Sequence, residues 1–143
     1  MIKPYQHVAK YYETDQMGII HHSNYIRWFE EARIDYMNQI GLTYKEMENQ
    51  GIISPVLEVT CQYLNMMYFD DTATIKVIIT DYTGVRFSVK YEVYNQNNKL
   101  CTTGTSRHCF MSKDGKPISL KRSKPEFDQL FKSVIQQNKL EDE

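Results

Sequence analysis

The hydrophobic pattern of this chain changes from a helical repeat to a strand repeat at about Ile52, and this change sets the class of fold. Before it, apolar side chains recur at helical spacing: Tyr25, Phe29, Ala32, Tyr36 and Ile40. After it, apolar side chains alternate with polar ones: Leu57, Val59, Cys61 and Tyr63. The first pattern predicts a helix of about four and a half turns with a broad apolar band. The second predicts a half-buried strand.

The long helix is bounded by residues that favour helix ends. Ser23 or Asn24 is expected to cap its start, and Gly41 lies where a helix commonly stops. Two pairs are spaced to attract each other on the helix surface: Arg27 with Glu31, and Glu30 with Arg33. We therefore expect a helix from Asn24 to Ile40 whose apolar band lies on a sheet.

The other segments predict one strand before the long helix and four after it. The first strand is expected from Tyr5 to Tyr12, and a loop around Gly18 follows it. A short second helix is expected from Thr43 to Asn49. The later strands are expected to be antiparallel and joined by hairpins, in this order: 57–63, 72–82, a strand containing Phe87 to Val93 after the turn at Thr83-Gly84, and 100–111.

The C-terminal part of the chain adds a short helix to this order. Pro125 opens it, and the polar residues from Gln136 to Glu143 are expected to fray. One face of this helix is apolar: Phe127, Leu130, Phe131 and Val134. One helix with a wide apolar face and an antiparallel meander make a two-layer α+β fold. With 143 residues and no visible linker, the chain is expected to form a single domain over residues 1–143.

Composition and charge exclude several classes of function. The formal net charge is −1, so no overall charge favours nucleic acid or an anionic membrane. No apolar run of a signal peptide opens the chain, and no segment approaches the ~20 apolar residues that span a bilayer. An odd number of cysteines without C-x-x-C spacing indicates free thiols: Cys61, Cys101 and Cys109. We therefore expect a reducing, cytoplasmic compartment.

The residues that can carry chemistry gather between Tyr11 and Tyr25. This stretch holds two carboxylates, a glycine and two histidines ahead of the helix: Glu13, Asp15, Gly18, His21 and His22. Carboxylates and imidazoles move protons near neutral pH, and a helix N-terminus offers unsatisfied N–H groups to developing negative charge. Gly18 is expected to supply a backbone conformation or a close approach that a side chain would block. The stretch therefore predicts an active site.

The same stretch resembles a known signature: Tyr11-Tyr12-Glu13-Thr14-Asp15-x-x-Gly18-Ile19-Ile20-x-His22-x-Asn24-Tyr25, with Phe29-Glu30-Glu31-Ala32-Arg33 downstream. It is similar to the 4-hydroxybenzoyl-CoA thioesterase family, and within it to the acyl-CoA thioesterase branch associated with the Tol–Pal system. The resemblance implies a hotdog fold, in which a curved antiparallel sheet wraps around one long central helix. It also implies hydrolysis of an acyl-CoA to free acid and CoA without a metal or organic cofactor, by a homo-oligomer. Dimers or tetramers are expected, with the sites at a subunit interface.

The resemblance also assigns roles to residues. Asp15 takes the place of the family's acidic residue, which attacks the thioester carbonyl or activates water. The backbone N–H at the helix start, at about His22, is implied to hold the carbonyl oxygen. Tyr11 and His22 take two further site positions, and Gly18 is counted with the substrate-binding residues.

Simpler interpretations remain open for several of these residues. Asp15 can equally cap a turn, and Glu13 is expected to be exposed or supporting. Tyr11 is expected to be a buried strand residue whose hydroxyl reaches the site. Adjacent histidines diverge on most backbones, so His21 is expected to point away from His22, and no metal site is predicted.

Two further segments and two other functions stay open. The run Met66-Met67-Tyr68-Phe69 can line an acyl pocket, belong to the core or form a subunit contact. A basic stretch can bind the phosphates of CoA or be an ordinary solvated turn: Lys113, Lys116, Lys121, Arg122 and Lys124. A non-catalytic module that docks an acyl carrier protein is the alternative function. An enoyl-CoA hydratase is a third, without a visible motif of its own.

Overall fold

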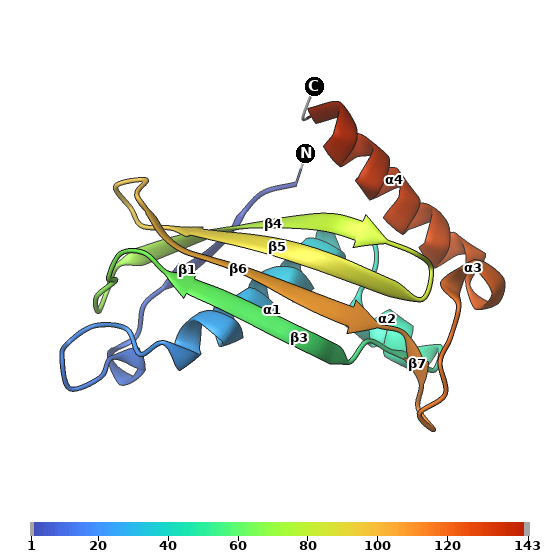
Figure 1. Ribbon diagram of the computed structural model, residues 1–143, viewed down its shortest axis with the longest axis horizontal. Coiled ribbons are helices and arrows are strands. Elements are labelled where there is room, and N and C mark those ends of the chain that lie inside the picture. Colours follow the sequence, from blue (N-terminus) through green and yellow to red (C-terminus); the bar gives the residue numbers. More distant parts are fainter. Residues whose placement is uncertain (1, 142–143) are drawn as a thin grey trace.

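The structure, a computed structural model, describes residues 2–141. Figure 1 shows a twisted sheet with the long helix α1 along one face and helix α4 at one end. In chain order the elements are β1 (Tyr5–Val8), the 3₁₀ turn η1 (Tyr11–Glu13), α1 (Ser23–Gln39), α2 (Tyr44–Asn49), β2 (Ile52–Ile53), β3 (Val56–Tyr63), β4 (Thr72–Tyr82), β5 (Arg86–Tyr94), β6 (Leu100–Cys109), β7 (Met111–Ser112), α3 (Leu120–Ser123) and α4 (Pro125–Glu141). The predicted α+β fold, with a long helix on an antiparallel sheet, is confirmed.

The main sheet has the strand order β1-β4-β5-β6-β3, and every neighbouring pair is antiparallel. The predicted hairpins between β4 and β5 and between β5 and β6 are confirmed. The expected hairpin between β3 and β4 is wrong, because β3 pairs with β6 at the far edge of the sheet. The segment between Tyr63 and Thr72 therefore carries the chain across the sheet (Figure 1). Strands β2 and β7 form a separate two-stranded sheet.

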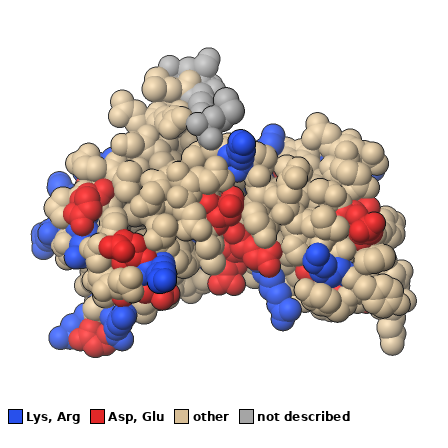
Figure 2. Space-filling view, turned by 180° about the vertical axis from the view of Figure 1, so that it is seen from behind, with Lys and Arg blue, Asp and Glu red and all other residues tan. Residues whose placement is uncertain are grey.

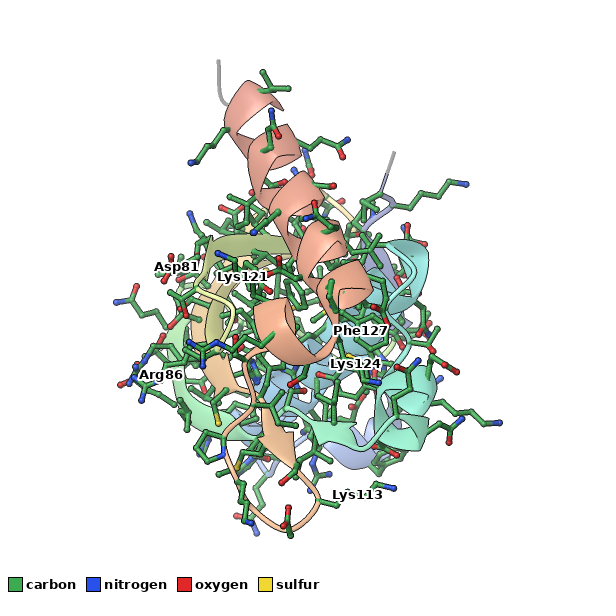
Figure 3. All side chains as sticks on the ribbon, turned by 90° about the vertical axis from the view of Figure 1, so that its right-hand side faces the viewer. Asp81, Arg86, Lys113, Lys121, Lys124 and Phe127 are labelled. Carbon is green, nitrogen blue, oxygen red and sulfur yellow. The ribbon has the colours of Figure 1, made fainter. Side chains whose placement is uncertain are left out.

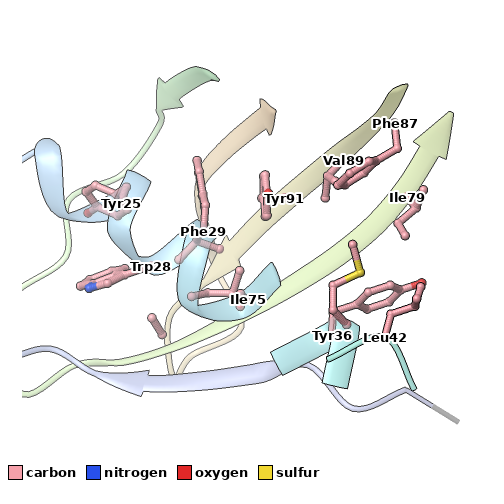
Figure 4. Close-up of a cluster of buried hydrophobic side chains, with 14 of the residues drawn as sticks. Tyr25, Trp28, Phe29, Tyr36, Leu42, Ile75, Ile79, Phe87, Val89 and Tyr91 are labelled. Carbon is pink, nitrogen blue, oxygen red and sulfur yellow. The ribbon is translucent and has the colours of Figure 1, made fainter. Parts of the chain in front are cut away.

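The core lies between α1 and the inner face of the sheet (Figure 4). The ring of Phe29 stacks on Tyr91 of β5, with centroids 4.4 Å apart. Gly104 of β6 makes room for Phe29, because a Cβ built at this glycine would lie 2.4 Å from the Phe29 ring. The broad apolar band of the helix is thus buried as its periodicity predicts.

Arg33 departs from the predicted surface pair with Glu30. Its side chain is buried and donates to two tyrosine hydroxyls, those of Tyr44 at 2.9 Å and Tyr91 at 3.0 Å. The other predicted pair is also wrong in the described residues, because Glu31 instead lies 3.4 Å from the ring of His7. Helical spacing predicts charges on the helix surface, whereas here residues of α2 and the sheet supply closer partners.

The buried polar chain that begins at Arg33 continues through the sheet. The hydroxyls of Tyr91 and Ser106 are hydrogen-bonded at 2.7 Å, and Ser106 in turn bonds the Nε2 of His108, also at 2.7 Å. His108 is fully buried and stacks on Phe87 at 4.6 Å. Burial, with the positive charge of Arg33, lowers the pKa of His108 to about 4.

Most helix ends follow the sequence, with two exceptions. Gly41 follows α1 with φ of +89°, the left-handed conformation that glycine favours at this position. Neither Ser23 nor Asn24 is the N-cap of α1, a position that His22 occupies without a side-chain cap. Helix α4 continues to Glu141, so the expected fraying from Gln136 is wrong as far as the described residues reach. The end of the predicted frayed tail, 142–143, lies outside them.

Helix α4 packs its predicted apolar face against the body of the molecule. Phe127 and Phe131 are buried in the hydrophobic core, and Figure 3 shows Phe127 at the first turn of α4. The three cysteines are free thiols, as predicted. Among the described helices, none has the length and apolar character that crossing a membrane requires.

Candidate active site

The candidate site is a loop between η1 and α1 whose two sides are hydrogen-bonded to each other. Thr14 and Ile20 form an isolated antiparallel bridge, and the Asp15 N–H donates to the carbonyl of Ile19 at 2.8 Å. The Ile20 N–H donates to the carbonyl of Met67 at 2.8 Å, which places the loop beside the segment that follows β3. The loop is therefore a small, internally braced structure rather than a loose connection.

Asp15 lies at the turn of this loop and is half-buried. Its Oδ1 accepts a hydrogen bond from the Met17 N–H at 2.8 Å, which is the turn-capping contact that its sequence position allows. Among the described residues, no group donates to its other carboxylate oxygen. The side chain is thus oriented through one oxygen while the other is free to act.

Gly18 closes the turn after Asp15. Its φ is +79°, and its N–H donates to the carbonyl of Asp15 at 3.0 Å. A Cβ built at Gly18 would meet no atom within 4 Å. Of the two predicted reasons for this glycine, the backbone conformation therefore holds and the close approach does not.

Not every backbone N–H at the start of α1 has a partner in the described part of the chain. The N–H of His21 donates to the Glu13 carbonyl, that of Ser23 to the His21 Nδ1, and that of Asn24 to the His21 carbonyl. The N–H of His22 donates to no group in the described part of the chain. His22 is exposed and precedes a helix of 17 residues, whose N-terminus favours negative charge.

The imidazole of His22 lies over its neighbour instead of pointing away from it. The rings of His21 and His22 stack with centroids 4.1 Å apart, so the expected divergence is wrong. The Tyr63 hydroxyl donates to the His22 carbonyl at 3.1 Å and fixes the backbone here. The ring nitrogens of His22 have no hydrogen-bond partner among residues 2–141, whereas the His21 Nδ1 bonds the Ser23 hydroxyl at 2.8 Å.

Tyr11 is not the buried strand residue that its pattern suggests. Strand β1 ends at Val8, and Tyr11 begins the 3₁₀ turn η1 with 76% of its surface exposed. The strand stops because the turn is closed by its own contacts, including a hydrogen bond from the Thr14 N–H to the Tyr11 carbonyl. The ring edge of Tyr11 contacts Phe69 at 5.5 Å between centroids.

Of the two roles expected for Glu13, exposed or supporting, the second holds, because the side chain is buried and braces the loop. Its carboxylate accepts from the Trp28 indole N–H at 2.7 Å, from the Lys10 N–H at 2.8 Å and from the His7 Nε2 at 2.8 Å. Burial acts to raise the pKa of Glu13, but the hydrogen bonds from His7, Lys10 and Trp28 outweigh it and hold the pKa below its ordinary value.

Sequence reasoning missed this anchor because two of its donors, His7 on β1 and Trp28 on α1, come from different elements that only the fold brings together. The available signal was Trp28, the only tryptophan of the chain, on the apolar band of α1. A buried indole usually finds an acceptor for its N–H, and a nearby carboxylate can provide one.

In the run from Met66 to Phe69 one side chain belongs to the core, and the other three keep the interpretations of acyl pocket and subunit contact open. Met67 is fully buried in the core. The other three side chains are exposed beside the Asp15 loop: Met66, Tyr68 and Phe69. Together with Tyr11, they give this end of the molecule an exposed apolar surface.

The basic stretch does not form one cluster. Lys113 lies at the tip of the hairpin after β7, whereas Lys121 and Lys124 lie at the end of the molecule by α3 and α4 (Figure 3). The face seen in Figure 2 carries both acidic and basic side chains. In the described residues, no group of three or more His, Cys, Asp or Glu side chains is placed to hold a metal ion.

Comparison with known proteins gives the family. The family model of the thioesterase-like superfamily matches residues 10–135. The chain is 33% identical over 127 residues to YneP of Bacillus subtilis, a candidate acyl-CoA thioesterase, covering 88% of this chain and 92% of YneP. It is 26% identical over 94 residues to the acyl-CoA thioester hydrolase YbgC of Escherichia coli, covering 65% and 70%.

A solved structure agrees with these sequences. The DHNA-CoA thioesterase of Staphylococcus aureus superimposes with a TM-score of 0.92 and 36% identity, covering 96% of this chain and 93% of that one. The family match and this similarity extend over nearly the whole chain, including the Asp15 loop, α1 and the sheet. The chain therefore belongs to the thioesterase-like superfamily and has the hotdog fold.

Proposed function

We propose that the Asp15 loop and the start of α1 hydrolyse an acyl-CoA thioester to free acid and CoA. The observation that carries this proposal is the pairing of an oriented carboxylate with an unused backbone N–H. Asp15 keeps one oxygen free, and the His22 N–H, which has no partner among residues 2–141, directly follows His21, whose own N–H donates to the Glu13 carbonyl. We further propose that the chain belongs to the acyl-CoA thioesterase branch of the 4-hydroxybenzoyl-CoA thioesterase family, because it carries the run Glu30-Glu31-Ala32-Arg33 and the loop motif.

In the proposed reaction the thioester carbonyl oxygen accepts a hydrogen bond from the His22 N–H. The free oxygen of Asp15 attacks the carbonyl carbon, or removes a proton from a water that attacks it. The C–S bond then breaks and CoA leaves as a thiolate. After direct attack the acyl group stays on Asp15 as an anhydride, and water hydrolyses it to the free acid and the restored carboxylate. After attack by water the free acid forms at once, and Asp15 passes its proton to the thiolate or to solvent. A thiol pKa near ~8.5 makes this leaving group tolerable without a strong acid. An oxyanion donor is worth ~3–4 kcal/mol, so the N–H contributes as much as a side chain can.

The exposed apolar side chains beside the loop suit the acyl group. Tyr11, Tyr68 and Phe69 are each more than half exposed in this chain, although their rings are large and apolar. Apolar pockets with few polar groups are the usual form of a small-molecule site. We propose that an aromatic or long aliphatic acyl group packs here. The S. aureus relative named for DHNA-CoA makes a naphthoyl thioester the first compound to test.

We also propose that the chain acts as a homo-oligomer joined through β3. Six of the eight residues of β3 are exposed, and on its predicted apolar face Leu57 and Tyr63 are exposed whereas Val59 and Cys61 are half-buried. Its free edge has no partner among residues 2–141. Exposed apolar edge strands are normally paired or covered. Pairing with β3 of a second copy would bond the free edge and cover the exposed apolar side chains of the strand.

Sedimentation equilibrium tests this arrangement. We expect the mass of a dimer or tetramer for the natural chain and dissociation for Leu57→Lys, because this side chain lies on β3 with 45% exposure. Val85→Lys is the control, since Val85 has 44% exposure on the turn between β4 and β5. A monomeric natural chain, or equal dissociation by both variants, contradicts the proposal.

A thiol-release assay with a panel of thioesters tests the function. The panel holds a short aliphatic, a long aliphatic and a naphthoyl CoA ester, and one acyl carrier protein thioester. We expect turnover of at least one CoA ester and its loss in Asp15→Asn. Binding of the acylated carrier protein without turnover of any compound would contradict the proposed hydrolysis. It would favour the alternative of a non-catalytic module that docks an acyl carrier protein.

A further inference from the structure

We propose that Glu13 is a positioning residue of the thioesterase site, which sets where Asp15 lies relative to the His22 N–H. The inference rests on the proposed function of Asp15. Glu13 does not reach the reacting atoms in this proposal, because its carboxylate is buried and accepts hydrogen bonds from three groups of the chain. Its effect on the reaction is therefore exerted through the loop.

The backbone of Glu13 joins the two sides of the loop. Its carbonyl oxygen accepts the His21 N–H at 2.8 Å and the Asn24 side-chain amide at 2.8 Å. Asp15 is two residues beyond Glu13, and His22 directly follows His21. The proposed nucleophile, Asp15, and the proposed oxyanion donor, the His22 N–H, are thus both positioned by contacts of Glu13.

The side chain of Glu13 ties this junction to the rigid part of the molecule. Trp28 is fully buried on α1, and its indole N–H holds the Glu13 carboxylate at 2.7 Å. Between this anchor and Asp15 lies only Thr14, itself held by its bridge to Ile20. A carboxylate with charge-assisted hydrogen bonds gives a stiffer connection than a neutral side chain.

Replacement of Glu13 by glutamine tests whether its carboxylate holds the loop in place. In the variant Glu13→Gln the side-chain amide has one acceptor oxygen, and its NH₂ group faces donors that a carboxylate would accept. The loop must shift to relieve this mismatch. A misplacement of about 1 Å at a reacting group can cost about 100-fold in rate.

Steady-state kinetics and a double-mutant cycle test the proposal. We would measure kcat and KM for the natural chain, Glu13→Gln, Asp15→Asn and the double variant, with the best compound of the panel. Glu31→Gln is the matched control, because Glu31 contacts the same His7 but does not bond the loop. The emission spectrum of Trp28 reports whether its hydrogen bond has changed, since the chain has no other tryptophan.

The proposal expects Glu13→Gln to lower kcat by about 10- to 100-fold with KM within about twofold, and Glu31→Gln to behave like the natural chain. In the Asp15→Asn background, Glu13→Gln should cost nothing further, because its effect passes through Asp15. A loss of equal size in both backgrounds overturns the proposal, as does a natural kcat with an altered Trp28 spectrum.

If Glu13→Gln does not fold, Trp28→Phe gives a second test. This variant keeps the carboxylate and two of its donors, and we expect a smaller loss of kcat at unchanged KM. A Trp28→Phe enzyme with natural kcat would also overturn the proposal. Activity that is unchanged in Asp15→Asn would instead refute the proposed function, so the two failures are distinguishable.

Discussion

The buried imidazole of His108 should make the fold sensitive to mild acid. Its pKa falls from an ordinary 6.5 to about 4 because burial and the Arg33 charge disfavour the protonated form. Between these values the unfolded chain binds a proton that the folded chain does not. The free energy of unfolding therefore falls as the pH falls, by about 1.4 kcal/mol per pH unit and about 3 kcal/mol over the window.

The pH range over which stability is lost distinguishes His108 from the buried carboxylates. The pKa values of Glu13 and Asp128 are lowered from ordinary values of 4.5 and 3.8, so these groups lose stability only at lower pH. The shift at Asp128 has the same origin as at Glu13: burial raises the pKa, and hydrogen bonds from Tyr82 and Lys132 more than offset it. Loss of stability between pH 6.5 and about 4.5 is therefore the signature of His108.

Urea unfolding at a series of pH values checks this prediction with two variants. His108→Phe keeps a ring on Phe87 and leaves Ser106 bonded to Tyr91, so its slope against pH should fall by about 1.4 kcal/mol per pH unit. Phe87→Leu is the control, because it loses packing at every pH and should keep the natural slope. An unchanged slope in His108→Phe would refute the reasoning.

Substitutions at three further positions test parts of the fold and the loop. Gly104→Ala should lower the free energy of unfolding by about 1–3 kcal/mol, since its Cβ meets the Phe29 ring; a loss under about 0.5 kcal/mol in urea unfolding would contradict this packing. Thr43→Ala removes the side-chain cap of α2 and should cost about 1 kcal/mol in the same assay. Gly18→Ala should lower kcat more than Gly18→Asn, because asparagine tolerates the positive φ better; the reverse order would argue against this role.

The elements of the fold were largely predictable because their signals are local. The helical spacing of apolar residues ends where α1 ends, and Gly41 has the left-handed φ expected of a glycine after a helix. The alternation of apolar and polar residues after Ile52 predicted β3. The pairing of β3 with β6 was not predictable. Strands that follow each other in the sequence usually pair in the sheet, and no residue near β3 indicates a more distant partner. The burial of Arg33 depends on Tyr91, a partner 58 residues away.

The site was predictable in its residues more than in its geometry. Asp15, Gly18 and His22 do lie in one braced loop at the start of α1. Tyr11 was misplaced because aromatic residues extend an apparent strand pattern past the point where a 3₁₀ turn begins. The burial of Glu13 was not predictable, because it depends on contacts with Trp28 and His7 that form only in the folded chain.

The rate of thiol release by Asp15→Asn, measured against the natural chain, tests the central claim most directly. Asparagine keeps an oxygen that can accept the Met17 N–H, so the loop and the Trp28 emission should be preserved. The account predicts that kcat falls by at least about 100-fold, because neither direct attack nor proton removal survives without the carboxylate. A kcat within about twofold of the natural value, in a folded variant, would contradict it.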